Sequence, residues 1–245
     1  MSAPALAPSA PLLRLTLRSL LGGRRALALG VLALIPIVAA LVYAAGDATV
    51  AREVFWARLL QRLVIPTIAA FVAVVLGSSA IADEREDGTI LYLASTPLPR
   101  LSLVVTKVLA AWLACMALLV PSTIAAAVIC LRDALTAEQI VWPLVGIALC
   151  TLCYSAVTCL LAMLVRRPVI LGVLYILLWE GSIATFAASA DRLSIAAYGR
   201  AVAVEGVVVV NAPDVSAGVA IALLLAATAL ATWAAARRFG RTELP

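Results

Sequence analysis

The sequence predicts an all-α integral membrane protein with six transmembrane helices, and three observations support this fold class. Of the 245 residues, 65% are hydrophobic and 13% are charged, whereas a soluble domain is about half apolar and about a quarter charged. Six stretches stay apolar over the roughly 20 residues that a helix needs to cross a hydrocarbon core of about 30 Å. The basic residues also gather in alternate loops between these stretches. A water-soluble globule is therefore excluded.

The composition excludes several classes of chemistry. The chain has no histidine, which excludes Ser-His-Asp catalysis, histidine metal sites and HExxH proteases. Its single lysine, Lys107, follows Val-Val-Thr rather than a glycine-rich loop, so the Walker A motif for nucleotide phosphates is absent. The cysteines lie in apolar runs, and Cys150-x-x-Cys153 lacks the second pair of ligands that a metal site needs. We therefore predict no catalytic residue, metal site or cofactor within the chain.

Residues 1–25 are expected to form a cytoplasmic tail and an amphipathic helix. The first ten residues are rich in Ala, Pro and Ser, and Pro11–Leu21 then carries Arg14 and Arg18 four residues apart among leucines. A helix of this kind lies in the plane of the lipid headgroups, and Gly22-Gly23 lets the chain turn from there into the bilayer. A basic tail without regular structure is the alternative.

The membrane domain is expected to cover residues 26–236, and residues 237–245 are expected to form a cytoplasmic tail. The predicted spans lie at about 26–45, 63–82, 103–131, 141–165, 169–187 and 215–236. Several prolines lie in or near these spans, which membrane helices tolerate because neighbouring groups satisfy the freed backbone carbonyls. One of them, Pro121, predicts a kink in the long third span.

The basic residues predict the orientation. If both termini lie on one side of the membrane, that side holds twelve of the 18 arginine and lysine residues and the other side holds six. The positive-inside rule then puts both termini in the cytoplasm, and the chain in the cytoplasmic membrane. The net charge of +5 is explained by this topology, so no nucleic-acid partner is expected.

Two outer segments carry signals of their own. Ala51–Gln61 places Phe55 and Trp56 between charged residues, which is typical of an interfacial helix or of an aromatic belt beside the second span. The long loop at 188–214 contains Val207–Val210, an apolar run that is too short to cross the membrane. A re-entrant segment, an interfacial segment and a simple packing contact all fit this run.

The cytoplasmic loop between the second and third spans has an unusual order of residues. An acidic cluster at 83–87 is followed by a short apolar run, Ile90–Leu93, and then by Pro97 and Pro99. An aspartate or threonine at the boundary can cap a short helix, which the prolines end. The exposed apolar face of such a helix requires either the membrane surface or a groove on another protein.

These residues resemble a motif of type-two ABC exporter permeases. The motif that carries the resemblance is Glu84-x-Glu86-x-Gly88-Thr89-Ile90-x-x-Leu93, followed by Pro97-x-Pro99-Arg100 and Lys107. It is similar to the signature E-x-G-T-hydrophobic…P-x-x-R…K of that family. The six spans, the amphipathic helix and the cytoplasmic termini are similar too, so the resemblance covers nearly the whole chain. It implies a short cytoplasmic coupling helix that docks on a separate ATPase subunit.

The resemblance also implies partners and contact residues. Two copies of an ABC ATPase subunit would bind ATP and magnesium, and the chain would pair with a second permease chain, identical or related. Acidic residues would contact basic ones on the ATPase, and apolar residues would fill its groove. The expected contact residues are Glu84, Glu86, Gly88, Thr89, Ile90 and Leu93. The alternative is a solvated run of charges that only satisfies the topology.

A second stretch suggests a subgroup. Residues 174–181, with the sequence LYILLWEG, and the later Ser194-Ile195-x-x-Tyr198 are similar to the subgroup that includes the nitrous-oxide-reductase maturation permease.

Glu180 is the one acidic residue within a predicted span. A lone charge there costs several kcal/mol on insertion scales of about 2.5–3.5 kcal/mol per residue, so the carboxyl needs a partner, a proton or water. One interpretation is a role in the translocation path or in outer-gate opening, with Arg192 or Arg200 as partner. The other is a structural hydrogen bond that ties the fifth span to a neighbour.

The leading interpretation is the permease subunit of an ABC exporter, which has no nucleotide site of its own and is not itself an enzyme. The alternative is a non-transport membrane anchor or assembly factor that recruits an ATPase for mechanical work. An intramembrane enzyme would need a catalytic constellation, and an ion-driven transporter would need several ionisable residues at mid-bilayer. The sequence offers neither, and it does not identify the substrate.

Overall fold

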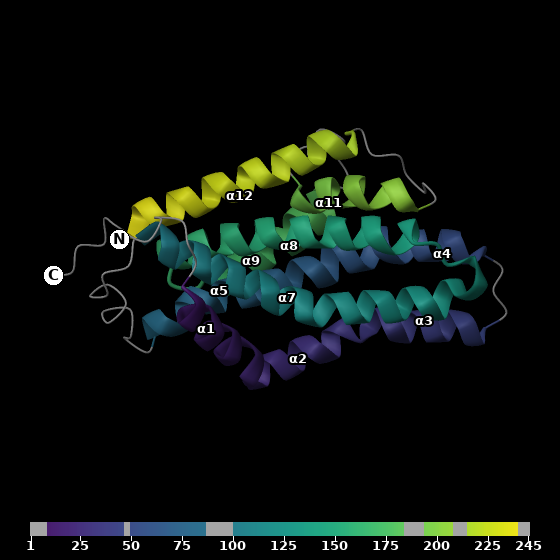
Figure 1. The fold of residues 1–245 in the computed structure, drawn as a ribbon, viewed down its shortest axis with the longest axis horizontal. Coiled ribbons are helices and arrows are strands. Elements are labelled where there is room, and N and C mark those ends of the chain that lie inside the picture. The colour runs from purple at the N-terminus through teal and green to yellow at the C-terminus, as the bar shows by residue number, and fades with distance from the viewer. Residues whose placement is uncertain (1–8, 47–49, 87–99, 184–193, 208–214, 240–245) are drawn as a thin grey trace.

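The computed structural model describes residues 9–46, 50–86, 100–183, 194–207 and 215–239. Within these ranges the chain is helical, with short turns and no strand. Figure 1 shows the long helices running side by side along one axis, which is the arrangement expected of a membrane-spanning bundle.

The centre of the bundle is α8 (Glu138–Leu164). It contacts α5 (Ala70–Glu86), α7 (Arg100–Leu131), α11 (Ile195–Ala203) and α12 (Ala217–Phe239). The contacts are lined largely by alanine, glycine, cysteine, serine and threonine, many of them fully buried. Small residues let helix backbones approach closely, which is how helices associate in a membrane, where burial of apolar surface gives no driving force between them.

The first predicted span consists of two helices, α2 (Arg24–Ala33) and α3 (Ile35–Ala45), with a bend between them (Figure 1). Pro36, in the first turn of α3, has no N–H group to continue the hydrogen-bond ladder. At the end of α2, the carbonyl of Ala33 accepts a hydrogen bond from the Ser122 hydroxyl of α7. The bend is thus supported by a side chain of a neighbouring helix.

The second span begins further back in the chain than predicted. The helix α4 (Arg52–Leu59), the π-helical segment η1 (Leu60–Ala69) and α5 follow one another without a break. The segment 51–61, expected as an interfacial helix or as an aromatic belt beside the second span, is therefore helical and continuous with that span. Trp56 is fully buried, and its Nε1 donates to the backbone oxygen of Gln139 over 3.3 Å. This tryptophan packs inside the bundle because its N–H finds a partner there.

The third and fourth spans are α7 and α8, joined by the short 3-10 turn η2 (Arg132–Ala134). Both helices contain a proline, Pro121 in α7 and Pro143 in α8, and both continue through it as α-helix. The kink expected at Pro121 stays a prediction. Trp112 on α7 donates from Nε1 to the backbone oxygen of Ala148 on α8 over 2.9 Å and ties the two helices together.

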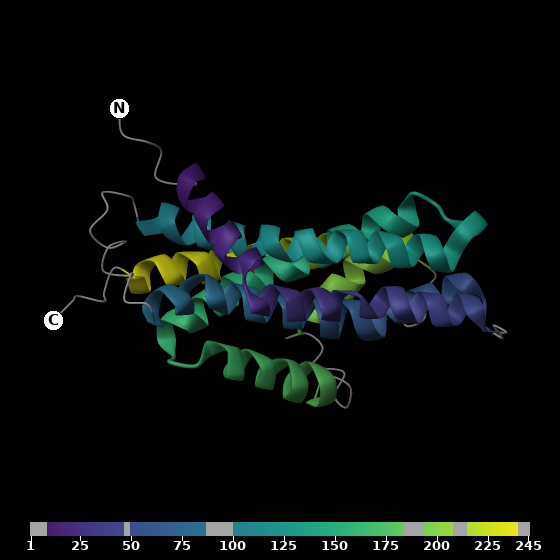
Figure 2. The ribbon, with the colours of Figure 1, turned by 90° about the horizontal axis from the view of Figure 1, so that it is seen from below.

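The fifth span is α9 (Pro168–Leu174), which continues as the π-helical segment η3 (Tyr175–Ile183). Figure 2 shows it in green along one flank of the bundle. Within the described residues, five helices are long and apolar enough to cross a membrane, and Pro168–Glu180 is a shorter apolar helix. The remainder of the predicted fifth span lies outside the described residues, so the count of six spans stays a prediction.

The predicted outer loop contains structure before α12 begins. Helix α11 and the 3-10 turn η5 (Val204–Gly206) pack against α8, and Val207 after them is buried. The rest of the Val207–Val210 run lies outside the described residues. The helix before this run thus packs into the bundle, although no helix was predicted there.

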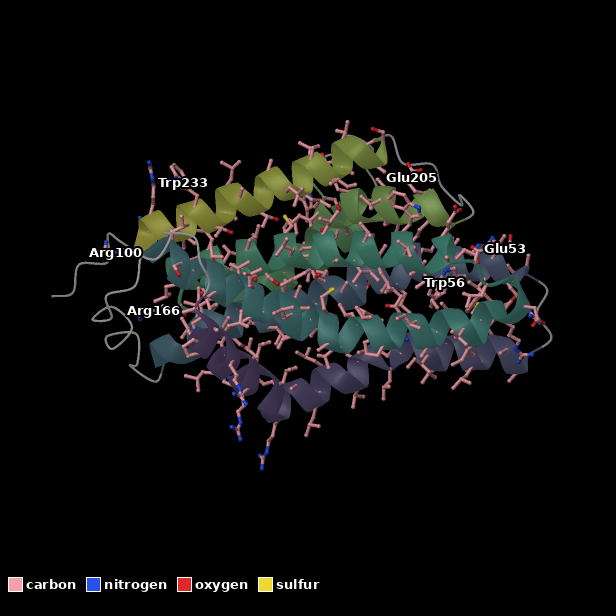
Figure 3. All side chains as sticks on the ribbon, viewed as in Figure 1. Glu53, Trp56, Arg100, Arg166, Glu205 and Trp233 are labelled. Carbon is pink, nitrogen blue, oxygen red and sulfur yellow. The ribbon has the colours of Figure 1, made fainter. Side chains whose placement is uncertain are left out.

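The two ends of the bundle differ in charge. Figure 3 shows Arg100, Arg166 and Trp233 at one end, which we call the basic end, and Glu53 and Glu205 at the other, which we call the opposite end. At the basic end Arg237 lies over the ring of Trp233, 3.7 Å from its centroid. The helix α1 (Ala10–Gly22) crosses the bundle obliquely towards the basic end (Figures 1 and 2).

Candidate functional site

The predicted coupling segment is attached at the basic end. Helix α5 continues to Glu86, one turn beyond the predicted end of the second span, and α7 begins at Arg100. The backbones of Glu84 and Glu86 thus belong to the last turn of α5. Gly88, Thr89, Ile90 and Leu93 lie outside the described residues, so the coupling helix itself stays a prediction.

A buried lysine fastens α1 beside this segment. Lys107, two turns into α7, is only 1% exposed, and its Nζ donates to the hydroxyl of Thr16 on α1 over 2.9 Å. Thr16 is also buried. A buried ammonium is costly unless it is hydrogen-bonded, so this contact fixes both the lysine and the helix that carries its partner.

Two further contacts extend this attachment to both helices that flank the segment. The backbone N–H of Ser9 donates to the hydroxyl of Thr106 on α7 over 3.1 Å. On the other side, the Arg25 guanidinium at the start of α2 donates to the Ser79 hydroxyl of α5 over 3.3 Å. The N-terminal helices therefore bridge the ends of α5 and α7.

The outward side of α1 is exposed. Arg14, Leu15, Arg18 and Leu21 all lie on the surface of the bundle, with Leu15 68% exposed. This pattern of arginines and leucines fits a helix at the lipid headgroups, and that position stays a prediction.

The second candidate site surrounds Glu180 in η3. This carboxyl group is 8% exposed, and its Oε1 accepts hydrogen bonds from the Tyr154 hydroxyl of α8, from the Ser194 hydroxyl over 3.5 Å and from the Ala196 backbone N–H over 3.3 Å. Ser194 is the N-cap of α11 and accepts from the N–H of Ala197 over 3.1 Å. One carboxylate oxygen thus joins the fifth span, α8 and the start of α11.

These contacts show which parts of the Glu180 hypothesis the geometry supports. The hydrogen bonds to neighbouring helices are present. Of the two arginines considered as partners, Arg192 lies outside the described residues, and Arg200 lies in α11, one turn beyond Ala196. A role in translocation or gating stays a hypothesis.

Sequence reasoning missed Tyr154 and the role of Lys107. Each is a polar group in the middle of an apolar run, and this pattern predicts that it has a buried hydrogen-bond partner. The partners could not be inferred, since Tyr154 and Glu180 are 26 positions apart and Lys107 and Thr16 are 91 apart.

In the part of the chain that the structure describes, no three His, Cys, Asp or Glu side chains gather as metal ligands would. The five cysteines are buried and unpaired by disulfides. Cys150 packs below α11, where its Sγ lies 3.6 Å from the backbone oxygen of Ile195.

Comparison with known proteins supports the same family as the coupling motif. The family model described as ABC-2 family transporter protein matches residues 24–185, which is roughly two thirds of the chain. A search of curated proteins found no match. The matched region begins with α2 and includes the whole segment between α5 and α7 and the fifth span to the end of η3. The chain therefore belongs to the ABC-2 family of transporter proteins and is a membrane permease of that family.

Proposed function

We propose that this chain is the permease subunit of an ABC exporter and that a separate ATPase subunit supplies the energy. The observation that carries the proposal is the construction of the basic end. Helix α5 ends there and α7 begins there. The N-terminal segment with α1 and α2 is fastened to them through Lys107, Thr106 and Ser79. A force applied to the segment between α5 and α7 would reach four helices at once.

The proposed contact with the ATPase is made by the segment that follows α5. Glu84 and Glu86 bind basic residues of the ATPase, and Ile90 and Leu93 fill an apolar groove, with Gly88 and Thr89 at the start of the coupling helix. ATP and magnesium bind to the ATPase, because this chain has no Walker A motif. Two ATPase subunits then work on a pair of permease chains.

The exposed apolar helices support both a bilayer location and a partner chain. Leu27, Val31 and Val42 on the first span and Leu230 and Trp233 on α12 are all exposed in the isolated chain. Side chains of this kind are stable only against lipid or against another protein. Within the family, the similarity at residues 174–181 supports the subgroup of the nitrous-oxide-reductase maturation permease.

The coupling contact is tested with Gly88→Pro. The full chain is purified in mild detergent with the ABC ATPase that binds it, and the complex is reconstituted into liposomes. We expect normal insertion and a loss of at least about tenfold in permease-stimulated ATP turnover, because proline fixes φ at about −65° and disfavours helical backbone at residue 87, so the segment after α5 loses the turn that a glycine permits.

Gly218→Pro is the matched control. Gly218 lies in the first turn of α12, where an added Cβ meets nothing within 4 Å and proline is tolerated. We expect turnover close to that of the wild type. Unchanged stimulation in Gly88→Pro would contradict the proposed coupling site, and stimulated turnover without release of any compound across the vesicle membrane would favour the anchor or assembly factor.

A further inference from the structure

Helix α11 is a short helix seated inside the bundle rather than on its surface. Figure 1 shows it between α12 and α8 in the half of the molecule that contains the opposite end. It contacts α8, α12 and η1, and Ala196, Gly199 and Val202 on it are buried. A helix that occupies this position closes the space between the spans at that end.

The fit between α11 and α8 is tight. A Cβ atom on Gly146 of α8 would lie 2.6 Å from the backbone oxygen of Gly199, and a Cβ on Gly199 would lie 3.0 Å from the Sγ of Cys150. The two glycines therefore let the backbones touch. Cys150, which is completely buried, is covered by α11.

The first turn of α11 is held by acceptors from two sources. Ser194 accepts the N–H of Ala197 within the same segment, and Glu180 accepts the N–H of Ala196 from the neighbouring η3. A helix N-terminus carries unsatisfied N–H groups and a partial positive charge, which a carboxylate stabilises. Glu180 is thus the group from another span that fixes where α11 begins.

The contact of Glu180 with its neighbours differs from an ordinary packing contact because all of its hydrogen bonds meet at one oxygen atom. The donors from Tyr154, Ser194 and Ala196 converge on Oε1, while Oε2 accepts no hydrogen bond from the residues that the structure describes. Through Oε1, η3 is therefore bonded at one point both to α8 and to the start of α11. The π-helical backbone of η3, on which Glu180 lies, is a form found frequently at functional sites.

We propose that Glu180 is a positioning residue that holds α11 closed against α8, and that release of Ser194 and Ala196 from Glu180 lets α11 move away during transport. The inference rests on the proposed function for its role in a transport cycle. We call the contact of Glu180 with Ser194 and Ala196 the latch. The latch lies within this chain, so it can be tested without an ATPase.

The test uses Cys150 as a native reporter of the position of α11. The full chain carries Cys150 as its single cysteine, with Cys115, Cys130, Cys153 and Cys159 replaced by alanine, in lipid nanodiscs that expose both faces. The rate of reaction with a water-soluble maleimide is compared between Glu180 and Glu180→Leu. We expect labelling to rise by about tenfold or more, because hydrogen bonds to a carboxylate are among the stronger ones in proteins.

Further variants separate a latch from general loosening. Glu180→Gln keeps an acceptor oxygen and should label at an intermediate rate, and Ser194→Ala should also label faster than the wild type. Gly146→Val, which wedges α11 away from α8, is the positive control. In a second background that keeps only Cys115, a buried thiol of α7 away from α11, Glu180→Leu should leave labelling unchanged.

The outcome decides the proposal. Faster labelling at Cys150 alone supports the latch. If Cys150 labels no faster in Glu180→Leu and Ser194→Ala while Gly146→Val responds, or if Cys115 becomes reactive to the same extent, the latch is overturned. Neither result depends on ATP turnover, so a failure of the ATPase coupling would be seen separately in the Gly88→Pro experiment.

Discussion

At the scale of single residues, polar side chains inside the described bundle act as ties between helices. Ser122 reaches the carbonyl of Ala33, Lys107 reaches Thr16, and Trp56 donates to the backbone of Gln139. Each of these groups would be costly to bury without a partner. In a membrane, where apolar helices gain nothing by leaving lipid for one another, such ties and close packing determine which helices are neighbours.

The contact of Ser122 with the first span gives a prediction at this scale. Ser122→Ala removes the hydrogen bond to the carbonyl at the α2–α3 bend. We expect a loss of about 0.6 kcal/mol, and at most about 1.7 kcal/mol, in the free energy of unfolding, as for other hydrogen bonds between membrane helices. Reversible unfolding in mixed micelles measures it. Thr232→Ala is the control, because the Thr232 hydroxyl bonds only within α12, to the oxygen of Thr228. Equal losses in both variants would show that the bend does not depend on Ser122.

The residues found from the sequence and those missed differ in a physical way. Glu180 stood out because a single carboxylate in an apolar run is unusual regardless of the fold. Its partners Tyr154 and Ala196 did not stand out, because a tyrosine or a backbone N–H becomes significant only when tertiary structure brings it to a carboxylate. A sequence can therefore identify a group that needs a partner without identifying the partner.

At the scale of helices, glycines set the distance between α8 and the segment after the fifth span. A Cβ on Gly146 would lie 2.6 Å from the oxygen of Gly199, and one on Gly206 would lie 2.1 Å from the oxygen of Glu138. Both obstacles are backbone atoms, which cannot move aside as a side chain can. These two positions hold α11 and η5 close to α8.

Gly146→Ala is predicted to destabilise the protein for this reason. The added methyl group must displace α11, and overpacking of this kind costs about 1–3 kcal/mol. Gly30→Ala is the matched control, since a Cβ on Gly30 in α2 meets nothing within 4 Å, and alanine is a better helix former by up to about 1 kcal/mol. Thermal unfolding in nanodiscs should lower the midpoint for Gly146→Ala and leave it equal or higher for Gly30→Ala. A stable Gly146→Ala protein would show that α11 does not pack as closely as described.

The attachment of α1 gives a second prediction at the scale of helices. Thr16→Val keeps the shape of the side chain and removes the acceptor of Lys107, so α1 should detach from α7 more often. We expect hydrogen exchange of the α1 amides to become about tenfold faster, as the loss of a hydrogen bond to a charged group implies. Ser19→Ala, which removes only a bond within α1 to the oxygen of Thr16, should change it little. Equal exchange rates in the two variants would contradict the role assigned to Lys107.

The sequence predicted the helices better than their connections. The apolar lengths of the third and fourth spans agree with α7 and α8 because hydropathy and length depend on the chain alone. The start of the second span was missed because Trp56 between charges has the pattern of an interfacial residue, whereas the fold buries it against Gln139. Helix α11 was missed because the small residues over 195–203 indicate close helix packing only when the fold brings them against a glycine of α8, as it does at Gly146.

At the scale of the whole molecule, charge distribution and fold agree on two distinct ends. Arg100 and Arg166 lie at the basic end, while Glu53 and Glu205 lie at the opposite end (Figure 3). The positive-inside rule predicts that the end richer in arginine faces the cytoplasm. That orientation also puts the segment between α5 and α7 where a cytoplasmic ATPase can bind, so the proposed function requires it.

The predicted orientation can be tested with single cysteines, each introduced into a chain whose native cysteines are replaced by alanine. Glu53→Cys, Glu205→Cys and Arg166→Cys each alter a side chain that is exposed in the structure. In intact spheroplasts, a membrane-impermeant thiol reagent should label the first two and should label Arg166→Cys only after the membrane is permeabilised. The reason is that α7, α8 and α12 each span the bilayer between the basic end and the opposite end, so these positions cannot share a side. Labelling of Arg166→Cys in intact spheroplasts would reverse the topology and remove the proposed ATPase contact, because the segment after α5 would then face away from ATP.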